Sequence, residues 1–295
     1  MGVDSMAFVT RMAHAALAGA LSAAVLGAFA GGAAASEPMP WQMGFQPAAS
    51  PTAERIDILN EVLLIIIVAT VVFVSGLLLY VVWRFAEKRN PTPSKTTHNT
   101  FIEVVWTVLP VIILMVIAIP SFKLLYFADR VEDAEMTVKA IGRQWYWSYE
   151  YPDYGNFTFD AIMVPEEELE PGQKRLLETD LSVVLPVDTD IRLLITASDV
   201  LHAFALPAFG IKLDAVPGQV NETWVRINRP GTYYGQCSEI CGTGHSYMPI
   251  KIVAVSKADF ESWVEQAKEE FARVDEPDRG VRLAEAASPV PASAD

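Results

Sequence analysis

The hydrophobic and polar positions divide the chain into an apolar first part and a second part of short alternating runs. Residues 62–83 carry no charged side chain. A helix of this length measures about 33 Å and matches a hydrocarbon core of about 30 Å. Residues 104–125 are nearly as apolar, with four interruptions, Pro110, Pro120, Ser121 and Lys123, that membrane helices tolerate. The pattern therefore predicts a hairpin of two transmembrane helices, at residues 62–84 and 103–127.

From residue 128 on, the chain consists of short runs that are rich in β-branched and aromatic residues. Eight runs of this kind are visible: MTVKAIG, QWYWSYEY, FTFDAIM, SVVLPV, IRLLITA, TWVRI, TYYGQ and IKIVAV. Turn sequences such as YPDYGN, EPGQ and NRPG separate them. Many short strands without alternating helices predict a β-sandwich or barrel over residues 128–256, and argue against a parallel α/β sheet.

The C-terminal region predicts one helix and a tail. Ser256 is a suitable N-cap for a helix over residues 257–274, whose apolar side chains share one face: Phe260, Trp263, Val264 and Ala267. Residues 275–295 are rich in proline and alanine, which predicts a disordered tail. The expected fold class is a membrane-anchored all-β protein, with a two-helix hairpin before the β domain and one helix after it.

The first 36 residues have the pattern of a signal peptide. Arg11 precedes an apolar run of small residues up to Ala30, and GGAAAS follows with a suitable cleavage region near Ala35 or Ser36. Residues 37–61 would then form an N-terminal periplasmic segment. A periplasmic protein lies in a compartment where disulfides persist, which bears on its two cysteines.

The loop between the two predicted spans sets their orientation. Residues 85–102 and the end of the first span carry four basic residues, Arg84, Lys88, Arg89 and Lys95. The positive-inside rule places this loop in the cytoplasm. We therefore expect a bacterial inner-membrane protein with two spans and with both ends of the mature chain in the periplasm.

Charge is unevenly distributed along the chain. The first 128 residues carry equal numbers of acidic and basic side chains, so the net charge of −14 resides in the predicted β domain and tail. An acidic domain repels nucleic acid and favours a cationic partner, because complementary fields steer encounter.

Both cysteines lie in one stretch, GQCSEICGTGHSYMP, and three interpretations compete for them. An even number of cysteines in the periplasm favours a disulfide, although such a short loop gains little from one. A redox pair would normally be Cys-x-x-Cys in a thioredoxin-like context, which this chain lacks. The third interpretation is a metal site. Thiolate, imidazole and thioether ligands suit copper, and they recur here at Cys237, Cys241, His245 and Met248.

A second imidazole would have to come from elsewhere in the predicted mature chain. His98 lies on the predicted cytoplasmic loop, which leaves His202, directly after the predicted strand IRLLITA. A single histidine in an apolar segment is more often a core residue than a ligand. Two thiolates, two imidazoles and a thioether nevertheless exceed the needs of one copper ion. They fit two ions bridged by both sulfurs, with the backbone carbonyl of Glu239 as a further weak ligand.

The chain resembles subunit II of the haem–copper cytochrome c oxidases over its predicted mature length. The resemblance rests on the hairpin and on three motifs: QWYWSYEY, DVLHAFALPAFGIKLDAVPG and YYGQCSEICGTGHSYMPI. It implies a cupredoxin domain with a binuclear copper A centre. The implied ligands are His202, Cys237, Glu239 through its carbonyl, Cys241, His245 and Met248. The carboxylate of Glu239 would bind a magnesium ion shared with subunit I. We expect no haem in this chain, because it has no Cys-x-x-Cys-His motif.

The resemblance also implies roles for residues outside the ligand set. Trp145 would receive electrons, and strand alternation would place it on the same face as Trp147. Glu103 would stand at the entrance of a proton path into subunit I. Four carboxylates would meet the lysines of cytochrome c: Glu150, Asp160, Asp180 and Asp199.

The implied function is electron transfer within an aerobic respiratory oxidase. Electrons would pass from cytochrome c through the copper A centre to haem in subunit I. Oxygen would be reduced there to water, with proton translocation. The expected partners are subunit I, subunit III, cytochrome c and the lipid bilayer, with no nucleic acid. A membrane-anchored copper-delivery protein is the alternative. Such a carrier needs neither Trp145 nor Glu103, and a domain with a purely structural disulfide is the third option.

Overall fold

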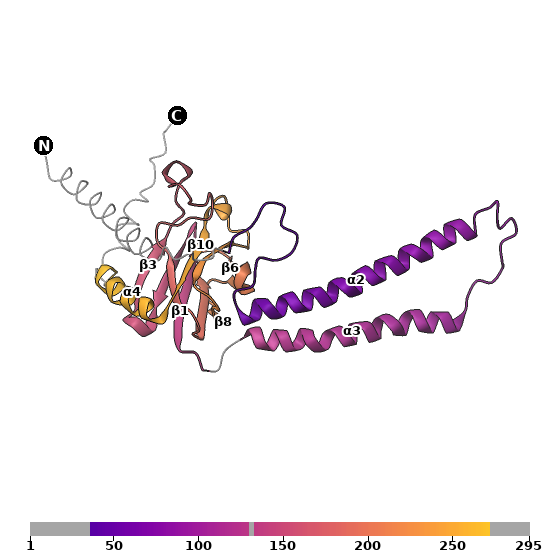
Figure 1. Ribbon diagram of the computed structural model, residues 1–295, viewed down its shortest axis with the longest axis horizontal. Helices are drawn as coiled ribbons and strands as arrows, with labels where there is room; N and C mark the ends of the chain where they lie inside the picture. The colour runs from indigo at the N-terminus through magenta and orange to yellow at the C-terminus, as the bar shows by residue number, and fades with distance from the viewer. Residues whose placement is uncertain (1–35, 130–132, 272–295) are drawn as a thin grey trace, which may run out of the picture.

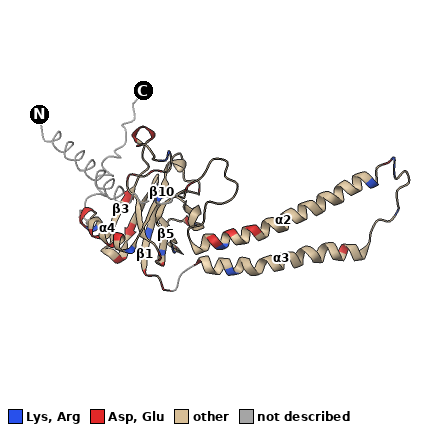
Figure 2. Ribbon diagram, in the orientation of Figure 1, with Lys and Arg blue, Asp and Glu red and all other residues tan. Residues whose placement is uncertain are grey.

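Two long helices, α2 (Pro51–Arg84) and α3 (Thr100–Asp129), lie side by side and leave the β domain on the same side (Figure 1). The computed structural model describes residues 36–129 and 133–271. Both helices are candidate membrane spans, with hydropathies of 3.1 and 2.7 over their most apolar windows. Figure 2 shows that their charged residues lie mainly toward the ends. Apolar side chains are exposed on all sides of both helices, as expected for helices that are surrounded by lipid. The predicted hairpin of two apolar helices is confirmed.

Both helices begin earlier than the apolar runs predict. The Ser50 hydroxyl accepts a hydrogen bond from the amide of Ala53 at 3.1 Å, and Pro51 follows at the first helical position. The Asn99 side chain accepts a hydrogen bond from the amide of Ile102 at 3.2 Å in the same way. Residues 51–61, assigned from the sequence to the N-terminal periplasmic segment, are therefore the first three turns of α2.

The β domain contains two five-stranded sheets, with strand orders β3-β2-β1-β5-β8 and β4-β10-β9-β6-β7. The first sheet comprises β1 (Met136–Arg143), β2 (Tyr146–Tyr151), β3 (Phe157–Ala161), β5 (Ile191–Ala197) and β8 (Asn221–Val225). The second comprises β4 (Val183–Pro186), β6 (His202–Leu206), β7 (Ile211–Ala215), β9 (Gly231–Cys237) and β10 (Pro249–Val255). The β1–β5 and β4–β10 pairs are parallel and the others are antiparallel. The predicted β-sandwich is confirmed.

Two of these strands, β6 and β7, are absent from the eight predicted runs. The β6 sequence, HAFAL, contains two alanines, and alanine is depleted in strands. A short turn, Pro207–Phe209, connects β6 to β7. His202 is thus the first residue of a strand within the sheet, whereas the sequence placed it in the connection after β5.

The C-terminal helix α4 (Lys257–Glu270) begins as predicted and ends at Glu270, with Phe271 as its C-cap, whereas the sequence extended it to residue 274. The Ser256 hydroxyl accepts a hydrogen bond from the amide of Asp259 at 3.2 Å, as an N-cap does. Phe260, Val264 and Ala267 are buried, which confirms the predicted apolar face. The predicted tail at residues 275–295 and the signal peptide, apart from Ser36, lie outside the described residues.

Direct contacts fix the hairpin to the β domain. The Trp224 indole on β8 donates a hydrogen bond to the Phe127 carbonyl at 2.8 Å, and Thr223 donates to the carbonyl of Ala128 at 3.1 Å. The Arg55 guanidinium of α2 lies 3.3 Å from the centre of the Phe127 ring. The spans and the β domain are therefore joined through side chains as well as through the backbone.

Candidate metal centre

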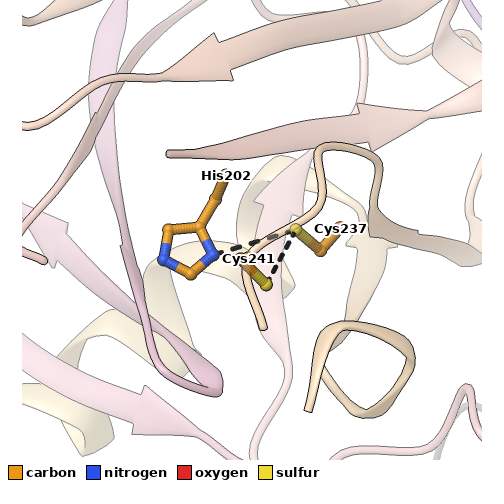
Figure 3. A group of neighbouring side chains, drawn as sticks. All are labelled: His202, Cys237 and Cys241. Atoms are coloured by element: carbon orange, nitrogen blue, oxygen red, sulfur yellow. Dashed lines mark hydrogen bonds between the residues drawn. The ribbon is translucent and has the colours of Figure 1, made fainter. Parts of the chain in front are cut away.

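Three segments bring sulfur and imidazole groups together at one end of the second sheet. His202 begins β6, Cys237 ends the adjacent β9, and the following loop carries Cys241 and His245. Phe204 of β6 pairs with Cys237, so the two strands hold these ligands in register. Donor atoms of His202, Cys237 and Cys241 all lie within 4.8 Å of one another, and Figure 3 shows their side chains converging.

Each sulfur faces one imidazole. The Cys237 sulfur lies 3.8 Å from Nδ1 of His202, and the Cys241 sulfur lies 3.6 Å from Nδ1 of His245. Each sulfur also has one weaker donor nearby. The Glu239 carbonyl oxygen lies 3.4 Å from the Cys237 sulfur, and the Met248 sulfur lies 3.6 Å from that of Cys241. The six donors therefore form two sets, each with one cysteine sulfur, one imidazole and one weaker donor.

The distance between the sulfurs fits bridging and does not fit a disulfide. The two cysteines are free thiols with sulfur atoms 3.9 Å apart. A disulfide bond measures about 2.05 Å, whereas a metal–thiolate bond measures about 2.3 Å. Half of the observed separation is shorter than a metal–thiolate bond, so one ion on each side of the sulfur pair can contact both. The residues present therefore fit a bridged pair of copper ions.

Four of the donor residues are buried, and the half-buried His245 lies at the edge of the site. His202, Met248, Cys241 and Cys237 are 0, 1, 4 and 7 % exposed. Burial favours the neutral thiol of Cys237, but hydrogen bonds from His202 and the backbone outweigh it and lower the pKa of this thiol. Burial and the negative charge of Cys237 raise the pKa of Cys241. The second proton is therefore harder to remove, and a bound cation would favour its loss.

Asp199 orients His202. Its carboxylate accepts a hydrogen bond from Nε2 of His202 at 2.9 Å, which leaves Nδ1 facing Cys237. The same carboxylate accepts hydrogen bonds from the backbone amides of Gln144 and Val200, each at 2.7 Å. A carboxylate behind a metal-ligating histidine fixes the ring and increases its basicity. The sequence marked Asp199 only as a docking residue, although its position three residues before a ligand was a signal for this role.

Trp145 lies in a turn and not in a strand, so the predicted alternation with Trp147 is wrong. Arg143 pairs with Tyr146, which leaves Gln144 and Trp145 as a two-residue turn between β1 and β2. The Trp145 indole donates a hydrogen bond to the Cys241 carbonyl at 3.2 Å. It therefore covers the ligand loop from outside.

Gly244 leaves the space that Trp145 occupies. A Cβ atom at Gly244 would lie 2.3 Å from the Trp145 ring, closer than real contacts allow. The neighbouring Gly242 has the same function to a lesser degree, since its Cβ would lie 3.0 Å from that ring. The loop therefore needs small residues at these positions for the indole to contact it.

A second indole contacts the site from inside the domain. Trp147 is fully buried and donates a hydrogen bond to the Met248 carbonyl at 3.3 Å. Its ring centre lies 6.0 Å from that of His202. The sequence placed Trp147 only in the sheet core, because the contact joins residues about a hundred positions apart.

The four predicted docking carboxylates differ in their surroundings. Asp160 accepts a hydrogen bond from the Ser148 hydroxyl at 2.6 Å. Asp180 accepts hydrogen bonds from the backbone amides of Ile162 and Leu181, each at 2.7 Å. Glu150 forms an ion pair with Lys139 at 3.2 Å. Burial, with the charges of Asp160 and Asp199, raises the pKa of Tyr146, the residue after Trp145. Asp199 lies beside the turn that holds Trp145, because its carboxylate accepts a hydrogen bond from the amide of Gln144.

Two predicted carboxylate residues, Glu239 and Glu103, lie at very different distances from the ligand cluster. The exposed Glu239 occupies the ligand loop between the cysteines. Glu103 lies in the first turn of α3, at the end of the hairpin farthest from the β domain. The structure therefore separates Glu103 from the metal centre by the length of a span.

Comparison with known proteins gives a consistent result over both parts of the chain. Residues 136–255 match the family described as "Cytochrome C oxidase subunit II, periplasmic domain", and residues 38–124 match its transmembrane domain. A probable cytochrome c oxidase subunit 2 of Rickettsia bellii is 54% identical over 230 residues, covering 78% of this chain and 86% of the relative. Cytochrome c oxidase subunit 2 of Arabidopsis thaliana is 51% identical over 231 residues, covering 76% and 89%.

A solved structure is also similar in sequence to the β domain. It is the crystal structure of the periplasmic domain of subunit II of cytochrome oxidase from Bradyrhizobium japonicum. It is 52% identical, covers 48% of this chain and 99% of its own, and has a TM-score of 0.45. The family matches and the full-length relatives show that the chain belongs to the cytochrome c oxidase subunit II family.

Proposed function

We propose that this chain is the electron-input subunit of an aerobic respiratory cytochrome c oxidase. It accepts electrons from reduced cytochrome c at a binuclear copper A centre and passes them to haem in subunit I. Oxygen is reduced there to water, with proton translocation. The observation that carries the proposal is the paired donor set, in which each cysteine sulfur lies within 3.8 Å of its own imidazole and 3.9 Å from the other sulfur.

The β-sheet holds the ligand residues in fixed positions, which favours rapid one-electron transfer. His202 and Cys237 lie on adjacent strands, and Met248 directly precedes β10. Ligands on a rigid sheet move little when charge changes, so little reorganisation opposes transfer. A copper pair bound there would supply a one-electron acceptor whose change in charge is shared by two ions. The Trp145 indole, hydrogen-bonded to the Cys241 carbonyl, links the outer surface to a ligand residue.

Cytochrome c docks, in this proposal, on the carboxylates around Trp145. Asp199 lies beside the turn that holds Trp145. Asp160, Asp180 and Glu150 complete the proposed docking group, and Lys139 partly neutralises Glu150. The β domain as a whole carries many acidic side chains (Figure 2). Charges at the rim of an interface mainly set the association rate and its dependence on salt.

Replacing Asp199 by asparagine tests whether it positions His202 in addition to docking. We expect Asp199→Asn to weaken copper binding by about tenfold and to change the copper spectrum at every ionic strength, because the ring loses its carboxylate partner. Asp160→Asn is the matched control. It should leave the spectrum unchanged and slow only cytochrome c association, by an amount that fades as salt is added. An unchanged spectrum for Asp199→Asn would contradict the positioning role.

Met248→Leu tests the weak ligand on the Cys241 side. Leucine fills a similar volume in this buried position, so we expect folding and copper content to be retained. The reduction potential should shift and cytochrome c oxidation should slow by about tenfold, since a weak axial donor tunes the potential of a copper site. Spectroelectrochemistry and stopped-flow mixing measure the two effects. Native potential and native kinetics together would remove Met248 from the ligand set.

Glu103 and Glu239 connect the chain to subunit I in this proposal. Glu103, in the first turn of α3, stands at the entrance of a proton path on the cytoplasmic side. The carboxylate of Glu239 holds a magnesium ion shared with subunit I, next to the copper ligands. Subunit III completes the group of proposed partners. The β domain lies on the periplasmic side of a bacterial inner membrane, and the basic loop that starts at Arg84 lies in the cytoplasm.

A copper-delivery protein is the competing proposal, and burial argues against it. A carrier releases its metal to an acceptor, whereas His202 and Met248 are at most 1 % exposed and both contact the buried Trp147. Rapid mixing of the purified oxidase with reduced cytochrome c separates the two. Electron transfer predicts that copper is reduced before haem, with no loss of copper. Haem reduction that precedes copper reduction, or copper transfer to an added apo-acceptor, would favour the carrier.

A further inference from the structure

The segment before α2 carries the two most exposed large apolar side chains in the described part of the chain. Trp41 and Met43 are both 98% exposed, and Met39 and Phe45 are 55% and 56% exposed. We call residues 38–45 the N-terminal loop. It contains no charged residue. A cluster of exposed aromatic and thioether side chains without charge is unusual on a surface that faces only water, and indicates a contact.

The N-terminal loop is anchored to the β domain at both ends. The Ser36 amide donates a hydrogen bond to Thr232 at 3.0 Å, and the Ala49 amide donates to Ala208 at 2.8 Å. The Ser50 hydroxyl donates to the Phe209 carbonyl at 2.7 Å. Its exposed side chains therefore project from a segment whose two ends are held in place.

Hydrogen bonds within the loop define its shape. The Gln42 side chain accepts from the amide of Met39 at 3.1 Å and donates to the carbonyl of Phe45 at 2.7 Å. Trp41, between them, has a φ of 61°, a left-handed conformation that is rare for a bulky residue. The backbone thus turns the Trp41 side chain outward in an unusual conformation, and does not fold it onto the domain.

The loop lies on the membrane side of the β domain. Figure 1 shows it extending from the domain on the side where α2 and α3 leave. Residues 51–61 of α2 place Ser50 about 16 Å from the start of the apolar span, measured along the helix axis. The headgroup layer extends about 5–7 Å outward from the hydrocarbon core. Its outer surface therefore lies about 10 Å from Ser50 along α2, and the loop must extend that far toward the membrane to reach it. The five residues from Phe45 to Ser50 reach up to about 17 Å when extended, which is sufficient.

We propose that the N-terminal loop inserts Trp41 and Met43 into the headgroup region of the periplasmic leaflet, as a third membrane contact beside the two spans. Tryptophan is enriched at this interface, where one side of its ring contacts apolar chains and its N–H group remains hydrated. The lack of charge removes the main cost of partial burial. Together with the contacts between α3 and β8, the loop fixes the tilt of the β domain over the bilayer. The proposal does not depend on copper chemistry.

Photocrosslinking from position 41 tests the proposal in the purified oxidase complex. Trp41 is replaced by benzoylphenylalanine, and the complex is placed in nanodiscs of phosphatidylethanolamine and phosphatidylglycerol. Ile162 is the control position. It is 49% exposed and follows β3, the edge strand opposite to β8, which contacts α3. After irradiation, mass spectrometry should find a phospholipid adduct on the chain from position 41 and none from position 162.

Two results would overturn the proposal. One is a crosslink from position 41 to another subunit, which would show that a protein covers the loop. The other is the absence of a lipid adduct at position 41 while the native copper spectrum shows that the chain is folded. Crosslinking from position 43 repeats the test independently, so one unreactive probe cannot decide the result.

Discussion

Replacing Cys241 with serine is expected to abolish the bridged copper pair. The Cys241 sulfur lies 3.9 Å from that of Cys237, and 3.6 Å from both Nδ1 of His245 and the Met248 sulfur. A serine oxygen is a hard donor that suits copper poorly and cannot bridge two soft ions. We expect copper content to fall from two ions to one or none per chain. Cytochrome c oxidation by the complex should fall by more than about 100-fold, because changes behind the ligands alone cost about 10–100-fold.

Metal analysis, EPR spectroscopy and an oxidase assay on the same preparation measure these effects. Thr243→Ser is a matched control, because Thr243 is an exposed residue of the same loop. It should retain two copper ions and the native spectrum. A Cys241→Ser variant that still binds two equivalent copper ions would show that the sulfur is not a bridge.

The second large effect is expected from Gly244→Ala. The added methyl group would lie 2.3 Å from the Trp145 ring, so the indole must move away from the ligand loop. Displacements of about 1 Å from a productive geometry can cost about 100-fold in rate. We therefore expect cytochrome c to reduce the copper centre about 100-fold more slowly, while a small-molecule reductant still reduces it at the native rate.

Stopped-flow reduction by cytochrome c and by the small reductant gives both rates. Gly76→Ala in α2 is the matched control, because a Cβ atom there meets nothing within 4 Å. Trp145→Phe provides a second variant that removes the indole and leaves the sequence of the loop unaltered. If both Gly244→Ala and Trp145→Phe accept electrons from cytochrome c at the native rate, electrons do not enter through Trp145.

The features that the sequence predicts well depend on local patterns. The two spans follow from long apolar runs, and their apolarity is independent of any partner in the fold. The proximity of Cys237, Cys241, His245 and Met248 is predicted in the same way, because all four lie within one short stretch. The N-cap of α4 at Ser256 is local in the same sense. In each case, neighbouring residues alone contain the signal.

The features that the sequence misses depend on contacts between distant residues. Residues 51–61 mix polar and apolar side chains, and the start of this helix is fixed to the β domain by the hydrogen bond from Ser50 to the distant Phe209 carbonyl. β6 contains alanines that have little strand propensity by themselves, and it is stabilised by β7 and β9 on either side. The turn at Trp145 results from the pairing of Arg143 with Tyr146. The spacing of Asp199 and His202 is a local signal, but the hydrogen bond that fixes Asp199 comes from Gln144, 55 positions away.

Copper loading of the purified chain, followed by metal analysis and EPR spectroscopy, tests the central claim most directly. The paired donors of His202, Cys237, Cys241 and His245 predict two copper ions per chain. The hyperfine pattern should come from one unpaired electron shared by two equivalent copper nuclei. One copper ion per chain with the pattern of a single nucleus, or an intact disulfide that takes up no copper, would contradict the account.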